Sequence, residues 1–163
     1  MSKASVKIIM GSGGDLEFCK KIGKVLDEFR ISYKYRVASA HKTPEKVLEV
    51  LSEDKEDLNL VYITVAGRSN ALSGFVDFNT PRPVIACPPY SEKYGGVDIF
   101  SSLRMPSGSG ALTVIEPEAA AVAAVKMLGL KDAGLVKKID SMQSKLKEKV
   151  DKADKEVGKH GKR

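Results

Sequence analysis

The residue best suited to proton transfer is His41, one of only two histidines in the chain. It lies in the polar segment Ser39-Ala40-His41-Lys42-Thr43-Pro44, between a run typical of a strand and a pattern typical of a helix. An imidazole has an ordinary pKa of about 6.5, so a general acid or base role at neutral pH is natural for it. A hydrogen-bonded loop histidine is the alternative interpretation. The other histidine, His160, stands in a charged tail and is not expected to take part.

A glycine-rich loop, Gly11-Ser12-Gly13-Gly14-Asp15, follows the apolar run 6–10 and precedes a pattern with helical spacing. Its backbone N–H groups and the dipole of the following helix would favour a phosphate, and Ser12 could donate a further hydrogen bond. Asp15 could then hold sugar hydroxyls, while Lys42 could bind the phosphate or remain solvated. The loop matches neither a dinucleotide fingerprint nor a Walker loop. Glycines that only turn the chain are the alternative.

Two more polar segments are candidates for the lid or floor of a ligand site. Arg68-Ser69-Asn70 follows the apolar run 60–65, and the second segment, rich in glycine and serine, contains Ser101, Arg104, Ser107 and Gly108. Binding residues are frequent in such loops, because a rigid scaffold positions them at the surface. Both segments are therefore expected near the ligand.

The two cysteines, Cys19 and Cys87, lie far apart, and no Cys or His spacing resembles a zinc site. We expect a reducing compartment and no metal. Cys87 could be a nucleophile, but it has no histidine near it in sequence, so a small buried residue at the end of a strand is the preferred interpretation.

The elements that would position these residues alternate between strands and helices. Apolar runs predict strands at 6–10, 33–37, 60–65, 83–86 and 111–115. Helical spacing predicts a helix over 16–29 opened by Asp15, one from Pro44 with Thr43 as N-cap, an alanine-rich helix ending at Gly129, and an amphipathic helix over 135–150. This order predicts a doubly wound α/β domain with a parallel sheet, whose loops meet at the carboxyl edge.

Composition narrows the class of protein further. The 163 residues suffice for one domain, with the catalytic part at 1–130 and a basic helix and tail of the same domain at 131–163. Of the net charge of +6, residues 131–163 contribute 11 Lys and Arg against 6 Asp and Glu. Such a tail is typical of a solvated helix face, so no nucleic acid partner is expected. Without a membrane span or leader, we expect a cytoplasmic protein with no membrane partner and a frayed end over 158–163.

Four motifs, taken in order, resemble the PurE family, the aminoimidazole ribonucleotide carboxylases and mutases of purine synthesis. The motifs are Met10-Gly11-Ser12-Gly13-Gly14-Asp15, Ser39-Ala40-His41-Lys42-Thr43-Pro44, Ala66-Gly67-Arg68-Ser69-Asn70 and Ser101-Ser102-Leu103-Arg104-Met105-Pro106-Ser107-Gly108. The resemblance covers about residues 6–130. It implies a flavodoxin-like three-layer α/β/α fold with a C-terminal amphipathic helix.

The resemblance also implies roles for individual residues. It makes His41 the catalytic proton carrier, Ser12, Ser39 and Lys42 the contacts of the ribotide phosphate, and Asp15 the ribose contact. Gly67 and Ser69, with Asn70 beside them, would surround the base and the carboxylate. The implied substrates are aminoimidazole ribotide (AIR) and CO2, the implied product is 4-carboxy-AIR (CAIR), and no biotin, ATP, metal or other cofactor is needed. The family forms tetramers or octamers, with the last helix reaching onto neighbouring subunits. The alternative for this helix is that it folds back on its own domain.

The third motif distinguishes two branches of the family. The mutase branch, which rearranges an N-carboxylated ribotide, has a second active-site histidine where this chain has Ala71. The chain therefore resembles the direct carboxylases, and its Lys42 agrees with them, but no synthetase is attached, as in the stand-alone form. A mutase is the alternative, and it would need Asn70 or Ser73 to replace the histidine. A second alternative is a flavodoxin-like phosphate- or nucleotide-binding module without catalysis.

Overall fold

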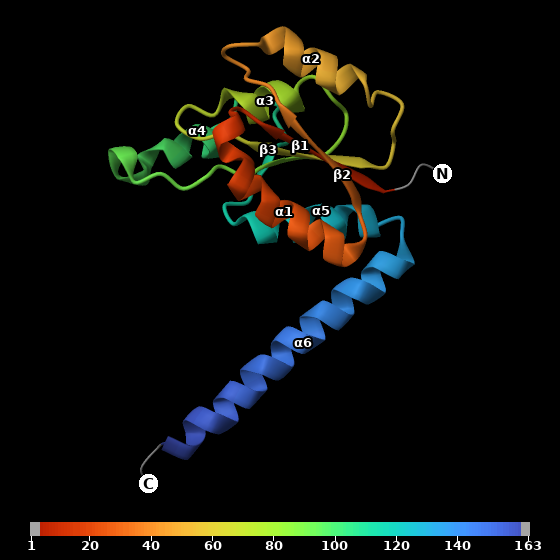
Figure 1. Ribbon diagram of the computed structural model, residues 1–163, viewed down its shortest axis with the longest axis vertical. Helices are drawn as coiled ribbons and strands as arrows, with labels where there is room; N and C mark the ends of the chain where they lie inside the picture. The colour runs from red at the N-terminus through yellow and green to blue at the C-terminus, as the bar shows by residue number, and fades with distance from the viewer. Residues whose placement is uncertain (1–3, 161–163) are drawn as a thin grey trace.

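The computed structural model describes residues 4–160, and its centre is a five-stranded parallel sheet in the order β2-β1-β3-β4-β5 (Figure 1). The innermost strands β1 and β3 are almost wholly buried and apolar, as is usual for strands covered on both faces. The strands are β1 Ser5–Met10, β2 Ser32–Val37, β3 Leu60–Val65, β4 Val84–Ala86 and β5 Leu112–Thr113. The predicted doubly wound α/β fold is confirmed, although β5 is shorter than the run 111–115 suggests.

The order of the strands reverses beside β1. The chain passes from β1 to β2 on one side and then returns to β3 on the other. At the carboxyl end of β1, Met10 lies opposite both Val37 of β2 and Val65 of β3. The three loops that follow these strands therefore start side by side, which is the usual position of a ligand in an open α/β sheet.

Helices cover the two faces of the sheet in separate layers (Figure 1). α1 (Leu16–Phe29) and α5 (Pro117–Gly129) pack on one face, where side chains such as Ile22 and Ala124 meet Ile8. α2 (Pro44–Ser52) and α3 (Ala71–Asp77) cover the other face, where Val47 and Leu72 meet Ile9. Because alternate residues of a strand point to opposite faces, Ile8 and Ile9 belong to different cores. The result is the expected three-layer arrangement.

Some short helical segments near the cleft are not among the helices that the sequence predicts. They are α3, a 3-10 segment Lys93–Ile99 and α4 (Phe100–Leu103). α3 buries Ser73 and Gly74 together with its apolar side chains, so its sequence lacks an amphipathic pattern. Its start depends on tertiary contacts of Asn70, which no periodicity reveals.

The last helix, α6 (Ala133–Val157), extends away from the sheet and its covering helices (Figure 1). The Asp132 side chain caps its start by accepting hydrogen bonds from the N–H groups of Gly134 at 2.8 Å and Leu135 at 3.2 Å. Only Leu135 and Ile139 of this helix are buried. A 3-10 turn, Gly158–His160, follows, and the rest of the end expected to fray, 161–163, lies outside the described residues. Among residues 4–160, no helix is both long and apolar enough to cross a membrane.

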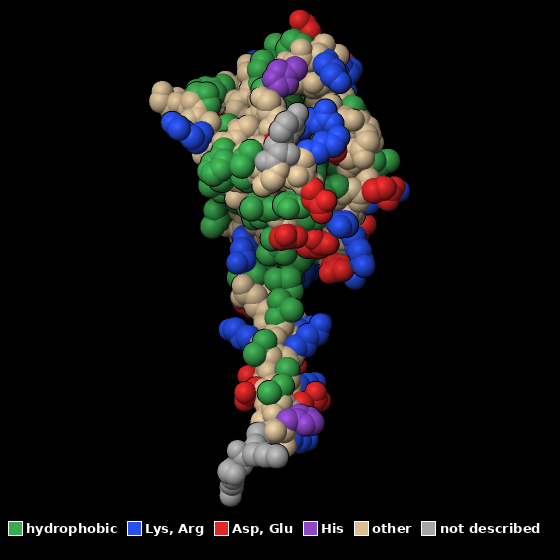
Figure 2. All heavy atoms as spheres, turned by 90° about the vertical axis from the view of Figure 1, so that its left-hand side faces the viewer, with side chains coloured by type: hydrophobic (Ala, Val, Ile, Leu, Met, Phe, Trp, Pro, Cys, Tyr) green, Lys and Arg blue, Asp and Glu red, His purple; other side chains and the backbone are tan. Residues whose placement is uncertain are grey.

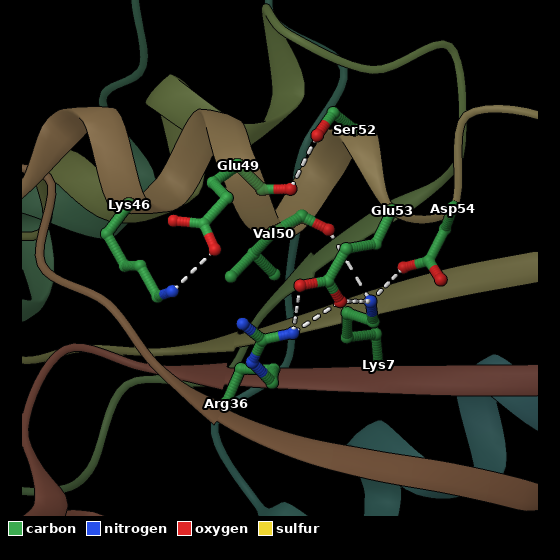
Figure 3. Close-up of polar contacts among 8 residues, drawn as sticks. All are labelled: Lys7, Arg36, Lys46, Glu49, Val50, Ser52, Glu53 and Asp54. Atoms are coloured by element: carbon green, nitrogen blue, oxygen red, sulfur yellow. Dashed lines mark hydrogen bonds and ion pairs between the residues drawn. The ribbon is translucent and has the colours of Figure 1, made fainter.

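A buried lysine ties α2 to the sheet (Figure 3). Lys7 of β1 is 2% exposed, and its Nζ lies 3.1 Å from Glu53 Oε2, forms a second ion pair with Asp54 and lies 3.4 Å from the Val50 carbonyl. Burying an ammonium is costly unless it is paired, so these acceptors at the end of α2 make the position of Lys7 tolerable. Arg36 of β2 also binds Glu53. Hydrogen bonds from Arg36 and then Lys7 hold the pKa of the Glu53 carboxyl at about 2, below its ordinary value of 4.5.

We expect Glu53→Gln to destabilise the protein at pH 7. Because the folded pKa of Glu53 is depressed, its contribution is complete above its unfolded pKa near 4.5 and disappears as the pH falls toward 2. The carboxylate is partly exposed and therefore screened, so the loss in the free energy of unfolding should be at most about 1 kcal/mol. Urea titrations at pH 7 and near pH 3 measure it. A destabilisation of equal size at both pH values would contradict the role of the ionised group.

Candidate active site

An open cleft of about 550 Å³ lies at the carboxyl edge of the sheet. It is lined by residues from the three loops that start side by side and by the segment after β4. Of the eight residues that the sequence analysis assigns to the site, the structure places seven in its lining: Ser12, Asp15, Ser39, His41, Lys42, Gly67 and Ser69. The eighth, Asn70, does not line it.

The loop after β1 forms a turn that leaves polar groups pointing outward. Ser12 is the N-cap of a 3-10 turn, Gly13–Asp15, and its Oγ accepts a hydrogen bond from the Gly14 N–H at 3.2 Å. The hydroxyl hydrogen of Ser12 can therefore still be donated to a ligand. Asp15 immediately precedes α1 but makes no capping hydrogen bond through its side chain, contrary to the predicted cap. Partial burial raises the pKa of its carboxyl.

The loop after β2 is closed by hydrogen bonds between its two ends. Thr43 Oγ1 accepts from the Ser39 N–H at 3.1 Å, and the Thr43 N–H donates to the Ser39 carbonyl at 2.8 Å. Thr43 precedes α2 as predicted, but its side chain does not cap the helix because it is engaged with Ser39. The Lys42 N–H also donates to Ser39 Oγ, at 3.3 Å. This compact turn presents the exposed side chains of His41 and Lys42 at its tip.

Asn70 is a structural residue rather than a lining one. It is 4% exposed, and its Nδ2 donates to Ser73 Oγ at 2.8 Å and to Ser102 Oγ at 2.9 Å. Its Oδ1 accepts from the Ser73 N–H at 3.2 Å and so caps α3. The polar atoms of the Asn70 side chain thus bond to groups of the protein, and a direct substrate contact by this side chain stays a prediction. The hydrogen bonds with Asn70 also engage the hydroxyl and the N–H of Ser73.

Arg68, between Gly67 and Ser69, has a left-handed backbone with φ 61°. This conformation costs an L-residue other than glycine roughly 1–2 kcal/mol, so tertiary contacts must hold it. Its side chain is exposed and lines the cleft. Left-handed residues other than glycine cluster at functional sites, so the backbone of Arg68 suggests that this loop has a functional role.

The segment after β4 contributes lining residues that the sequence analysis did not assign. They are Pro89, Tyr90, Ser91, Lys93 and Asp98. The one signal for them was the position of Pro88-Pro89 at the end of a parallel strand, where ligands bind in this type of fold. Ala71 also lines the cleft, whereas Arg104, Ser107 and Gly108 do not.

Neither cysteine is suited to catalysis. Burial raises the pKa of the Cys87 thiol to about 12, and its Sγ donates to the Ile115 carbonyl at 3.6 Å. Cys19 is also fully buried, and burial raises the pKa of its thiol to about 12. A thiol of this kind is protonated at neutral pH and is a poor nucleophile, which supports the interpretation of Cys87 as a core residue. Within residues 4–160, no group of three or more His, Cys, Asp and Glu side chains is placed to hold a metal ion.

Comparisons with known proteins find one family for the chain. The family model described as AIR carboxylase matches residues 5–149. A phosphoribosylaminoimidazole carboxylase of Archaeoglobus fulgidus is 56% identical over 92% of this chain and 83% of its own length, and one of Treponema denticola is 44% identical over 89% and 92%. A bifunctional carboxylase/succinocarboxamide synthetase of Homo sapiens is 44% identical, but the match covers only 31% of that protein. The crystal structure of Treponema denticola PurE matches with a TM-score of 0.92 and 42% identity over 95% of this chain and 99% of that chain.

Proposed function

This chain belongs to the AIR carboxylase family, and we propose that it joins CO2 to aminoimidazole ribotide to give CAIR, reversibly, in purine synthesis. The observation that carries this proposal is the shared cleft, in which His41 faces the same space as the glycine loop and the loop of Gly67. One cleft thus combines a proton carrier, a candidate phosphate site and backbone donors. The matched relatives of similar length carry the carboxylase name.

Different residues of the cleft bind the phosphate, the ribose and the base of the substrate. Ser12, Ser39 and Lys42 bind the phosphate of the ribotide, because two hydroxyls and an ammonium on adjacent loops suit its charge. The Asp15 carboxylate accepts hydrogen bonds from the ribose hydroxyls. The base then extends toward His41 and the loop of Gly67 and Ser69, where the carboxylate forms.

The chemistry needs one C–C bond and one proton transfer. AIR is an enamine, so the electron pair at C4 attacks the carbon of CO2, and one C–O π pair moves onto oxygen to give a carboxylate. The C4 proton then passes to His41, and the electrons of the C–H bond restore the aromatic ring. Backbone N–H groups of the Gly67 loop stabilise the negative charge that develops on the carboxylate.

The alternative mutase activity would need a group that replaces the second active-site histidine of the mutase branch. Ala71 lines the cleft where the mutase branch has a histidine, and a methyl group transfers no proton. Asn70 and Ser73, which are two candidates to replace it, are buried and bonded to each other. These positions favour direct carboxylation. A binding module without catalysis remains the other candidate, and turnover tests it.

We expect purified protein to form CAIR from AIR in proportion to added CO2, and to gain nothing from the N-carboxylated ribotide beyond the AIR that this compound releases. CAIR absorbance, followed with carbonic anhydrase present to equilibrate CO2 and bicarbonate, measures both reactions. Turnover of the N-carboxylated ribotide alone would show a mutase. No turnover with either compound, together with ribotide binding, would show a binding module.

We expect His41→Ala to lower kcat by about 10²- to 10⁴-fold, the range for loss of a general acid or base, while the Kd for AIR changes by less than about threefold. The phosphate and ribose contacts, which lie in other side chains, explain the retained affinity. His160→Ala, at the exposed end of the chain, is the matched control and should leave both constants unchanged. Full activity of His41→Ala would remove His41 from the mechanism.

We propose further that residues 131–163 form an oligomer contact of the same domain. Along α6, Val136, Leu146, Val150 and Val157 are exposed, and Figure 2 shows hydrophobic side chains among the charged ones of the projecting helix. These positions recur at helical spacing, so they form a stripe that a single copy leaves in water. A second copy of the chain can cover it in a tetramer or an octamer.

We also propose a cytoplasmic location, consistent with two free buried thiols.

We expect Leu146→Glu with Val150→Glu to shift the protein from an assembly toward the monomer, because both carboxylates would be buried without partners in the contact. Ser141→Glu with Ser144→Glu adds the same charge away from the stripe and should leave the assembly intact. Sedimentation equilibrium measures the mass, and circular dichroism verifies the fold. A monomeric wild-type protein would contradict the proposal.

A further inference from the structure

The backbone of the loop between β3 and α3 forms three hydrogen bonds with side chains of one distant segment. The Arg68 N–H donates to Asp98 Oδ2 at 3.1 Å, and the Asn70 N–H donates to Ser101 Oγ at 2.9 Å. Ser101 Oγ also lies 2.9 Å from the Arg68 carbonyl and 2.7 Å from the Asp98 carbonyl, which share its one hydrogen. Both polar groups of the Arg68 backbone are therefore engaged by residues about thirty positions away.

This bonding explains the unusual backbone of Arg68. A left-handed residue with a side chain persists only where its surroundings determine it. Asp98 and Ser101 bind the N–H and the carbonyl on either side of the strained φ of 61°. Without these two side chains, Arg68 would relax to an ordinary backbone conformation and its neighbours would move with it.

The segment that carries Ser101 is itself held by buried hydrogen bonds. The neighbouring Ser102 accepts from Asn70 Nδ2 at 2.9 Å, and its carbonyl accepts from Thr113 Oγ1 of β5 at 2.9 Å. Ser73 joins the same network to Thr64 of β3 at 2.8 Å. The anchor of the loop thus rests on the rigid sheet at two strands, as precise positioning requires.

The backbone groups of this loop divide into two sets. The N–H groups of Arg68 and Asn70 are used by Asp98 and Ser101, whereas within residues 4–160 no hydrogen bond joins the N–H of Gly67 or Ser69 to another group of the protein. Gly67 and Ser69 both line the cleft. The N–H groups of Gly67 and Ser69 are therefore among the donors of this loop that remain available to a ligand.

We propose that Asp98 and Ser101 are positioning residues that hold Arg68 left-handed and so aim the N–H groups of Gly67 and Ser69 at the carboxylate formed in the reaction. This inference rests on the proposed carboxylase function and deepens it. Asp98 acts as a hydrogen-bond acceptor and not as an acid or base. Donors that are already in position before the reaction stabilise the transition state more than the bound ribotide. Loss of Asp98 or Ser101 should therefore affect kcat more than KM.

The first experiment compares Asp98→Ala, Asp98→Asn and Ser101→Ala in AIR carboxylation. Asp98→Ala and Ser101→Ala should lower kcat by about 10- to 100-fold with the KM for AIR within about threefold, because the phosphate and ribose contacts are on other loops. Asp98→Asn keeps an acceptor for the Arg68 N–H and should retain kcat within about threefold. Ser52→Ala, whose hydroxyl bonds its own helix at Glu49, is the control. An Asn variant as inactive as the Ala variant would overturn the positioning role.

A second comparison uses the conformational freedom of glycine. Arg68→Gly removes the strain at φ 61°, so Asp98→Ala should cost less than about threefold in kcat when added to Arg68→Gly. Equal costs in both backgrounds would show that Asp98 acts through something other than the backbone of Arg68.

Hydrogen exchange separates this proposal from the proposed function. In Asp98→Ala, the Arg68 amide, which loses its acceptor, should exchange at least about tenfold faster than in the wild type, with the core strands unchanged. If the wild-type protein lacks turnover, the carboxylase proposal fails while exchange still reports on the anchor. If the wild type is active and the Asp98→Ala and Ser101→Ala variants match it in kcat and exchange, only the anchor is wrong.

Discussion

The pairing of β1 with both β2 and β3 is the constraint on which the rest of the structure depends. Its register places Val37 and Val65 opposite Met10, so three loops leave the sheet at one point. The strand order reverses there, and the helices that follow diverge to opposite faces, which leaves room for a cleft between them. Residues of these three loops, which lie up to about sixty positions apart in the sequence, therefore line the same cleft.

Hydrogen bonds hold the loops around the cleft in place. Ser12 bonds Gly14, Thr43 bonds Ser39, and the loop of Arg68 is anchored by Asp98 and Ser101. Backbone groups held in this way lose little further freedom when a ligand arrives, so less of the binding energy is spent on ordering them. Exposed side chains such as His41 are therefore attached to a fixed backbone and remain accessible to a ligand.

The buried ion pairs of Lys7 stabilise the same site from the opposite end of α2. The start of α2 carries the loop of His41, and its end is tied to β1 through Glu53 and Asp54 (Figure 3). A helix of nine residues has little stability alone, so contacts at both ends are needed to keep it in place. The apolar side chains Val47 and Val50 supply the remainder by packing under the helix. Stability and the placement of His41 are thus coupled through one element.

The sequence by itself determined the alternation of strands and helices and most of the cleft. Apolar runs and helical spacing are local properties, and the carboxyl edge of a parallel sheet collects the loops whatever their sequence, so Ser12, Asp15, His41 and Gly67 could be placed together in advance. Only the tertiary structure decided the rest. Asn70 looked like a ligand contact because it is polar and next to Ser69, yet it turns inward, since the buried hydroxyls of Ser73 and Ser102 need its amide. Lys7 was hidden in an apolar strand, and Asp98 lies thirty residues from the backbone that it holds. Such partners are chosen by proximity in space, which no local pattern records.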